Sequence, residues 1–402
     1  MSKMDVNLKG LTVSKKFAVA YPFPMHLAQR FTYHLSILQF AHALSEYVPV
    51  YLLVLDKQVC LEQMFREEFG IDMPSTLIIV SLKNTRLGFK SNTLWFRAGV
   101  NSVLKRLSSE YSKVIVYSRN VKIFNYLVRT KLKRNLNITY AFESHQLFSQ
   151  NLGFNCEFDR AKQEHQLETS LYPQTDHVFA NTPLLALQIK KLFSVNATVL
   201  PVAVREDDLL KANVAPHIDF QSRHYDFAYV GSFDKWKGVE TLVSALDLLK
   251  KNNWTGRAVL VGIRKHEVSK WNEIICQFEL SKHVDLVERV PRRSVFKYID
   301  NAKFGVVPNS MLDDSIFNTS PLKLFDYAAR GLPIVVSRVP AIDAGVSPPV
   351  TLWCRPDDPK SLSEALCKAL QKHKCLSFGN CEWASEHTWR LRAKTVLAKI
   401  LS

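Results

Sequence analysis

Short apolar runs alternate with amphipathic helical stretches along most of the chain, and this alternation limits the possible folds more than any other feature. In the first half the apolar runs lie at residues 17–21, 50–55, 77–80, 114–117, 138–142 and 177–180. Helical periodicity fills several of the intervals, for example 31–46, 101–109 and 184–192. Strands that alternate with helices predict a parallel, doubly wound α/β sheet.

The same alternation returns after a segment in which it fades, between about residues 204 and 224. We interpret this segment as a linker between two Rossmann-like domains, for which 402 residues with 47% apolar content suffice. The predicted domains are residues 1–205 and 206–380, and 381–402 are expected to form a helix that crosses back onto the first domain. Two such sheets predict a cleft lined by the carboxyl ends of their strands, where ligands of open α/β sheets bind.

Targeting signals and cysteine spacing give weaker expectations. The start of the chain lacks the apolar stretch of a secretion signal, and no run of about 18 apolar residues occurs, so we expect a cytoplasmic protein. The seven cysteines are scattered without a C-x-x-C pair, which argues against a disulfide framework or a zinc site.

The chain is strongly basic, with a formal net charge of +16. About two thirds of the excess lies before residue 205, notably in 83–97 and 129–134. Such a half suits an anionic membrane surface, an acidic glycan or lipid-phosphate substrate, or nucleic acid. A solvated surface without a partner is the simpler alternative. Nucleic acid ranks last, because no compact recognition module accompanies the charge.

Two segments of the second half carry the residues suited to phosphate chemistry. In the first, Gly231 follows an apolar run and lets the backbone approach a ligand, and Lys237 precedes a helix with a mobile positive charge. In the second, Ser320 and Pro321 form a plausible helix start whose unpaired amides suit a diphosphate. Asp326, an acceptor when ionised, suits two vicinal ribose hydroxyls. Taken singly, Gly231 and Lys237 are equally compatible with an ordinary strand-to-helix turn that carries an exposed lysine, and Asp326 alone would more often be a solvated helix carboxylate.

Taken in order, these segments resemble the C-terminal domain of retaining glycosyltransferases of family 4, which have the GT-B fold. The resemblance covers most of residues 225–372 and includes 317–333, Phe-Asn-Thr-Ser-Pro-Leu-Lys-Leu-Phe-Asp-Tyr-Ala-Ala-Arg-Gly-Leu-Pro. It implies that Lys237 and the amides around Leu322 and Lys323 contact the donor diphosphate, and that Asp326 holds the ribose.

The sequence departs from the family pattern at three of these positions. Asp326 replaces the usual glutamate and is one methylene shorter, and Asn318 stands where another glutamate often touches the donor sugar. Ser232 stands where arginine is favoured, so Arg264 is the candidate for the missing phosphate-binding cation. These departures leave the contact with the sugar open.

In the first half of the chain, the candidate site residue is His145. An apolar run ends near residue 142, and Glu143 and then His145 follow it closely. A histidine there can hydrogen-bond a sugar hydroxyl or the reacting region. The resemblance implies a place beside the donor sugar. No D-x-D triplet occurs, and the pairs at 313–314 and 357–358 lack further carboxylates at ligand spacing, so we expect no metal and no other cofactor.

The resemblance implies a retaining, hexosyltransferase-like enzyme that is metal-independent and moves a sugar from a nucleotide-diphosphate sugar to a hydroxyl of a glycan or lipid-linked saccharide. The cytoplasmic protein would be peripheral on the inner face of a membrane, with its basic half toward membrane and acceptor. One alternative is a nucleotide-sugar hydrolase or epimerase of the same fold, which would act without an acceptor. Another is a catalytically weak GT-B partner or scaffold protein, which would bind no donor.

Overall fold

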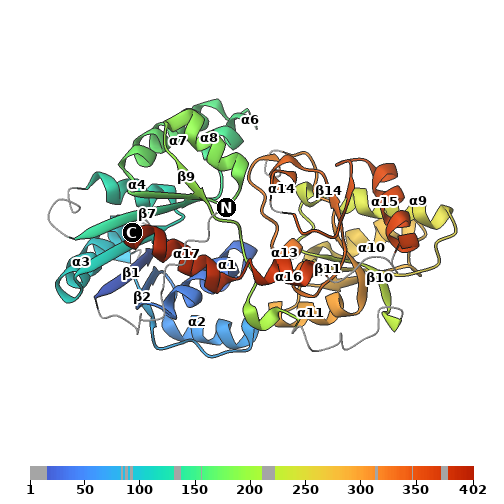
Figure 1. Cartoon of the computed structure of the whole chain (residues 1–402), viewed down its shortest axis with the longest axis horizontal. Coiled ribbons are helices and arrows are strands. Elements are labelled where there is room, and N and C mark those ends of the chain that lie inside the picture. Colours follow the sequence, from blue (N-terminus) through green and yellow to red (C-terminus); the bar gives the residue numbers. More distant parts are fainter. Residues whose placement is uncertain are drawn as a thin grey trace. The chain divides into compact units, whose positions relative to one another are not determined.

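The computed structural model describes residues 16–82, 85–86, 89–90, 94–130, 137–154, 156–210, 222–312, 316–345, 347–372 and 379–402. The chain divides into two compact units (Figure 1). Unit 1 comprises residues 1–200 with 389–402, and unit 2 comprises residues 201–388. The sequence predicts these boundaries after residues 205 and 380, whereas residues 201–205 and 381–388 both group with unit 2 in the structure.

Unit 1 is built on a seven-stranded parallel sheet in the order β3-β2-β1-β6-β7-β8-β9. Its strands are β1 (Phe17–Pro22), β2 (Val50–Val54), β3 (Leu77–Ser81), β6 (Lys113–Ser118), β7 (Ile138–Ser144), β8 (His177–Ala180) and β9 (Ala197–Val199). Its α-helices are α1 (Thr32–Ser45), α2 (Gln58–Met64), α3 (Leu94–Glu110), α4 (Val121–Arg129), α6 (Phe148–Phe154), α7 (Phe158–Leu171), α8 (Pro183–Phe193) and α17 (Trp389–Leu401). The expected doubly wound sheet is confirmed.

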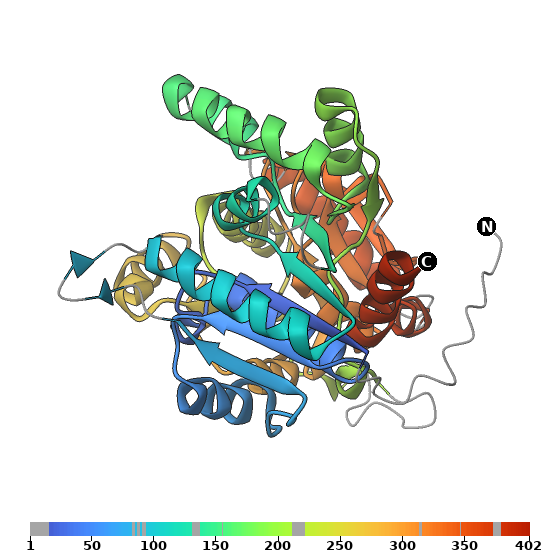
Figure 2. The same cartoon turned by 90° about the vertical axis from the view of Figure 1, so that its left-hand side faces the viewer.

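Alternation along the central strands distributes the helices of unit 1 over two faces. Ala18 and Val116 share a core cluster with apolar residues of α3, α4 and α8. Figure 2 shows α3 lying across this face of the sheet. Tyr117, which points the opposite way, packs against Phe40 of α1, and Phe40 in turn contacts Trp389 of α17. The expected return of the last helix to the first domain is thereby confirmed.

Unit 2 repeats the architecture with a six-stranded parallel sheet in the order β12-β11-β10-β13-β14-β15. Its strands are β10 (Tyr225–Val230), β11 (Ala258–Ile263), β12 (Val284–Glu288), β13 (Ala302–Val307), β14 (Ile334–Ser337) and β15 (Thr351–Cys354). Its α-helices are α9 (Val239–Lys251), α10 (Val268–Gln277), α11 (Arg292–Asp300), α13 (Leu322–Ala329), α14 (Pro340–Asp343), α15 (Pro359–Lys372) and α16 (Asn380–Ser385). The predicted linker contains a short 3₁₀ helix at Glu206–Asp208, and its part at 211–221 lies outside the described residues.

Both sheets change their direction of growth between two central strands, β1 and β6 in unit 1 and β10 and β13 in unit 2. The carboxyl ends of such strand pairs are where open α/β sheets bind ligands. Each unit therefore has one sheet edge, the carboxyl end of its central strands, where candidate site residues are expected.

No helix within the described part of the chain is both long and apolar enough to cross a bilayer.

Candidate active site

The carboxyl end of β10 leads into a glycine turn beside α13. Gly231 has φ 145°, and its amide donates to the Val261 carbonyl at 2.9 Å. A β-carbon built on Gly231 would lie 3.1 Å from Lys323 Nζ. Since this backbone conformation favours glycine, the residue provides both the turn and the room for the ammonium group.

Lys323 lies in the first turn of α13, and its side chain is buried. It is only 6% exposed, and its Nζ lies 3.8 Å from the ring centroid of Tyr229. Within the described residues this ammonium has no hydrogen-bond partner. Burial, and next the charge of Lys237, hold the pKa of Lys323 well below its usual value, against the opposing effect of Asp234. A buried cation without an acceptor is unfavourable unless an anion arrives.

The sequence prediction for this position concerned the amide of Lys323 and missed its side chain. A lysine in the first turn of a helix opposes the helix dipole, which favours anions at that end. This unfavourable placement of a lysine is visible in the sequence and could have indicated that the cation has a function. The burial that makes it decisive depends on α13, in which Lys323 and the six residues after it are all buried.

Lys237 ends a short 3₁₀ helix, Lys235–Lys237, between β10 and α9. Its Nζ lies 3.4 Å from the ring centroid of Trp236, and its charge lowers the pKa of Lys323. The two lysines thus share one positive electrostatic environment at the carboxyl end of β10. This is the region in which the sequence predicted diphosphate contact.

Gly238 joins Lys237 to α9 and gives a test of the turn. It has φ +71°, and a β-carbon there would lie 1.8 Å from the Pro308 carbonyl oxygen. We expect Gly238→Ala to lower the free energy of unfolding by about 3 kcal/mol, through the left-handed backbone and the clash. Gly153→Ala is the control, because a β-carbon there meets nothing within 4 Å. Chemical denaturation measures both, and equal stability of the two variants would contradict the prediction.

Two further candidates, Ser232 in this turn and Arg264, which follows β11, are joined through Asp234. Ser232 donates to Asp234 Oδ2 at 2.6 Å, and Arg264 pairs with Asp234 and with Glu267. Burial alone would raise the pKa of Asp234, but the Ser232 and Arg264 hydrogen bonds and the charges of Arg264 and Lys237 lower it. Arg264, expected to replace a missing phosphate-binding cation, therefore already has two carboxylate partners.

The start of α13 differs in detail from the sequence expectation. Pro321 is the N-cap residue rather than the first helical residue, and the helix begins at Leu322. The Ser320 hydroxyl does not cap the helix; it accepts a hydrogen bond from the Val202 amide at 3.3 Å. The amides of Leu322 and Lys323 belong to the first turn, where helices leave such groups without intrahelical acceptors. Asn318 lies buried in the preceding loop.

The Asp326 carboxylate, predicted to accept hydrogen bonds from the ribose, already accepts two from Arg292. Its Oδ2 accepts from Arg292 Nη1 at 3.0 Å and its Oδ1 from Arg292 Nη2 at 2.5 Å. Arg292 begins α11, and its Nη2 also lies 3.8 Å from Asp208 Oδ2. A ribose contact by Asp326 would have to share the carboxylate with Arg292, a partner that the sequence reasoning did not identify.

In unit 1, His145 lies just beyond β7, which continues to Ser144 and so includes Glu143. His145 Nε2 lies 2.5 Å from Glu143 Oε1, and the histidine side chain is about one third exposed. Burial, then the charge of Arg119, lower the pKa of His145 against the pull of Glu143. A neutral imidazole held by a carboxylate can bind a hydroxyl group.

Glu143 itself is the centre of a buried ionic cluster. It pairs with Arg119, with Arg392 of α17 and with His145, and it accepts a hydrogen bond from the Tyr117 hydroxyl. Burial would raise the pKa of Glu143, but Arg119, Arg392 and His145 lower it well below the usual value. This cluster orients His145 and ties the last helix of the chain to the carboxyl end of β7.

The residues considered for metal binding have other roles or cannot be placed. Asp358 accepts from the Ser361 amide at the start of α15, and Asp357 accepts from the Met311 amide. The pair at 313–314 lies outside the described residues. Among the residues that are described, no group of three or more His, Cys, Asp or Glu side chains could hold a metal ion.

Comparison with known proteins adds a family match in unit 2. Residues 224–372 match the model of the family described as Glycosyl transferases group 1. No curated protein matches the chain.

Solved structures are similar over nearly the whole chain. Sucrose-phosphate synthase from Thermosynechococcus elongatus has a TM-score of 0.71 at 16% identity, covering 96% of this chain and 99% of that one. Anabaena HepE in complex with UDP has a TM-score of 0.67 at 11% identity, covering 96% and 99%. WaaG, described as a glycosyltransferase involved in lipopolysaccharide biosynthesis, has a TM-score of 0.65 at 12% identity, covering 95% and 99%.

At these identities the structural likeness shows the fold, which is GT-B, as the sequence resemblance implied. The family match supports a group 1 glycosyltransferase.

Proposed function

We propose that this protein is a retaining, metal-independent glycosyltransferase of family 4. It moves a sugar from a nucleotide-diphosphate donor to a hydroxyl of a glycan or lipid-linked saccharide. The carrying observation is the buried ammonium of Lys323, which has no hydrogen-bond partner among the described residues and lies beside the Gly231 turn. A diphosphate supplies the charge and the acceptors that this group lacks.

In the proposed reaction, the bond between the sugar C1 and the diphosphate oxygen breaks while the acceptor oxygen bonds to C1 on the same face. The departing phosphate oxygen takes the acceptor's proton, so no separate protein base is needed. Lys323, Lys237 and the first amides of α13 stabilise the charge that develops on the leaving diphosphate. By resemblance, His145 and Asn318 contact the donor sugar and Asp326 the ribose.

UDP-sugars are the first donors to test. The HepE structures carry titles naming UDP, UDP with glucose, and UDP-glucose. By analogy we propose a nucleotide sugar, with UDP-glucose as the starting probe, for unit 2 of this chain. The basic residues of unit 1 are proposed to face an anionic membrane and the acceptor.

An assay with and without acceptor tests the proposed reaction. UDP-sugars are incubated with the protein and a panel of saccharide and lipid-linked acceptors, and the anomeric configuration of the product is read by NMR. We expect transfer with retention only when an acceptor is present. Sugar release or conversion without acceptor would favour the hydrolase or epimerase, and inversion would contradict the retaining mechanism.

His145→Ala is expected to lower turnover by about 100-fold with donor affinity largely kept, because the imidazole is proposed to act at the donor sugar. Steady-state kinetics and donor titration separate the two effects. His145→Gln, which keeps a hydrogen-bonding group, should recover part of the loss. Unchanged turnover in His145→Ala would remove this residue from the active site.

A further inference from the structure

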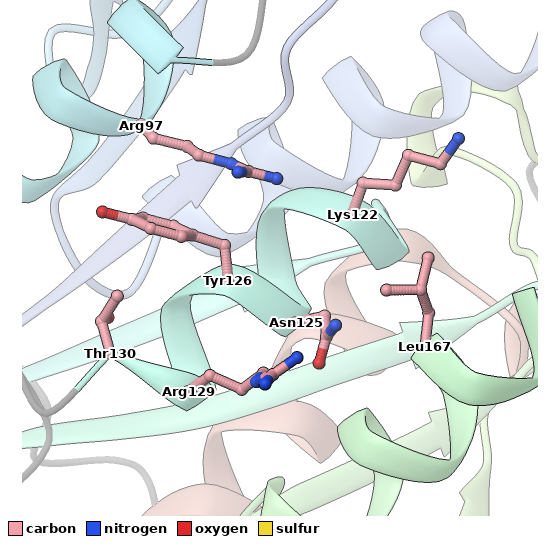
Figure 3. A pocket seen from close by; sticks show the side chains of 7 residues that line it. All are labelled: Arg97, Lys122, Asn125, Tyr126, Arg129, Thr130 and Leu167. Atoms are coloured by element: carbon pink, nitrogen blue, oxygen red, sulfur yellow. The ribbon is translucent and has the colours of Figure 1, made fainter. Parts of the chain in front are cut away.

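A pocket of about 490 Å³ opens on unit 1 between α3, α4 and α7. Its lining combines cations, polar groups and one apolar side chain: Arg97, Lys122, Asn125, Tyr126, Arg129, Thr130 and Leu167 (Figure 3). None of these residues belongs to the proposed donor site. Arg97 and Arg129 come from the two basic stretches noted in the sequence, whose remaining parts include residues outside the described ranges.

The positive charge of this pocket is poorly compensated. Neither Arg97 nor Arg129 has a carboxylate partner within the described ranges, and the buried Nε of Arg97 lacks a hydrogen-bond partner there. The Arg97 guanidinium extends over the Tyr126 ring, 4.7 Å from its centroid (Figure 3). Lys122 forms an ion pair with Glu164, with 3.3 Å between Nζ and Oε1. Among the described residues, this is the single ion pair that a lining residue of the pocket makes.

The pocket also contains a buried polar group. Asn125 is only 4% exposed, and its Oδ1 has no hydrogen-bond partner in the part of the chain that the structure describes. Tyr126 presents its ring to Arg97, while its hydroxyl accepts from Asn101 at 2.6 Å. Buried amides without partners are rare in folded proteins, so Asn125 indicates a ligand group that fills this position.

We propose that this pocket binds a phosphate ester of a saccharide or other polyol. Arginine forks match phosphate oxygens in pairs, and two arginines, Arg97 and Arg129, line this pocket. The volume exceeds what a phosphate needs, since a water molecule occupies only about 30 Å³ in the liquid. The remaining space, with the buried amide oxygen of Asn125 on its wall, suits the hydroxyl groups of a sugar or polyol.

The test uses the whole protein without nucleotide sugar, and Lys237→Ala separates binding at this pocket from binding of the same probe at the proposed donor site. Calorimetry with glucose 1-phosphate should give saturable binding that is at least tenfold tighter than binding of glucose. The double variant Arg97→Gln/Arg129→Gln should weaken this binding at least tenfold. Lys237→Ala, which changes unit 2, should keep it.

The control variant Lys105→Gln/Lys191→Gln removes two positive charges from exposed positions of α3 and α8 outside the pocket. It should bind glucose 1-phosphate like the wild type, and all variants should melt at the wild-type temperature. Equal weakening in the control would show a general effect of net charge and overturn the proposal. So would the absence of saturable binding to the wild type, or equal affinity for glucose.

An experiment with lipid vesicles distinguishes the two possible sources of the phosphate ester, a lipid headgroup and a soluble phosphorylated saccharide. Vesicles with phosphatidylinositol are compared with vesicles of phosphatidylcholine alone. Binding that requires phosphatidylinositol, is lost in the double variant and is competed by glucose 1-phosphate identifies a lipid headgroup. Binding of glucose 1-phosphate without any vesicle preference identifies a soluble phosphorylated saccharide.

Discussion

Replacing Lys323 with methionine is expected to weaken nucleoside diphosphate binding about 30-fold and to stabilise the unbound protein. A hydrogen bond to a charged group contributes about 1.5–3 kcal/mol, and 1.4 kcal/mol corresponds to a factor of ten. Methionine keeps much of the buried volume of lysine but removes an ammonium without a partner among the described residues. Removing such a charge should raise the free energy of unfolding by roughly 1–2 kcal/mol.

The stability gain should also depend on pH. Burial lowers the pKa of Lys323 well below 10.5, so between the two pKa values the unfolded chain binds more protons than the folded chain. The stability of the wild type therefore rises with pH across that window. The advantage of Lys323→Met should be largest below the lowered pKa and should shrink as the pH increases through it.

Calorimetry with UDP and denaturation over a pH series measure these effects. Lys270→Met, at an exposed position of α10, is the matched control and should leave UDP affinity unchanged. A Lys323→Met variant that binds UDP like the wild type would remove the ammonium from the donor site. A loss of stability in that variant would show that the ammonium is satisfied in the unbound protein.

Glu143→Gln is expected to destabilise unit 1 by about 3–5 kcal/mol, the largest stability effect we predict. The substitution keeps the shape of the side chain but leaves Arg119 and Arg392 buried without their carboxylate. Breaking a buried ion pair on one side has this magnitude because an uncompensated charge remains. Hydrogen exchange in α17 should accelerate, since Arg392 connects that helix to β7.

Glu46→Gln is the control. Glu46 follows α1 and pairs with Arg390, which lies in α17 like Arg392, but this ion pair is largely exposed to solvent. It should change stability by less than about 1 kcal/mol. Glu143 also gives a pH signature: its pKa is lowered below 4.5, so its contribution is present above 4.5 and is lost as the pH falls through the folded-state value. A Glu143→Gln variant as stable as Glu46→Gln would contradict the account of this cluster.

The strands and the last helix could be predicted because their patterns are local. The apolar run predicted at 50–55 is β2, Val50–Val54, and the crossover helix predicted within 381–402 is α17, Trp389–Leu401. A strand buried on both faces of a parallel sheet is a continuous apolar run, and this signal needs no knowledge of its neighbours. By contrast, α7 was not predicted, because only Glu168 and Leu171 of its residues are buried.

The contacts within the candidate sites were beyond such reasoning because they join distant segments. Arg392 meets Glu143 across 249 positions, and Arg292 meets Asp326 across 34. A single sequence shows that both carboxylates exist but not which guanidinium faces them. The residue types suited to phosphate were recognisable, whereas the burial of Lys323 emerged only from the packing of α13.

A calorimetric comparison of UDP with uridine is the most direct test of the central claim, that unit 2 binds a nucleoside diphosphate through its lysines. We predict that the wild type binds UDP far more tightly than uridine, and that Lys237→Ala loses much of this preference while its affinity for uridine stays unchanged. Equal loss of UDP and uridine binding in Lys237→Ala would contradict a phosphate role. No detectable binding of UDP or of other nucleoside diphosphates to the wild type would contradict the proposed enzyme as a whole.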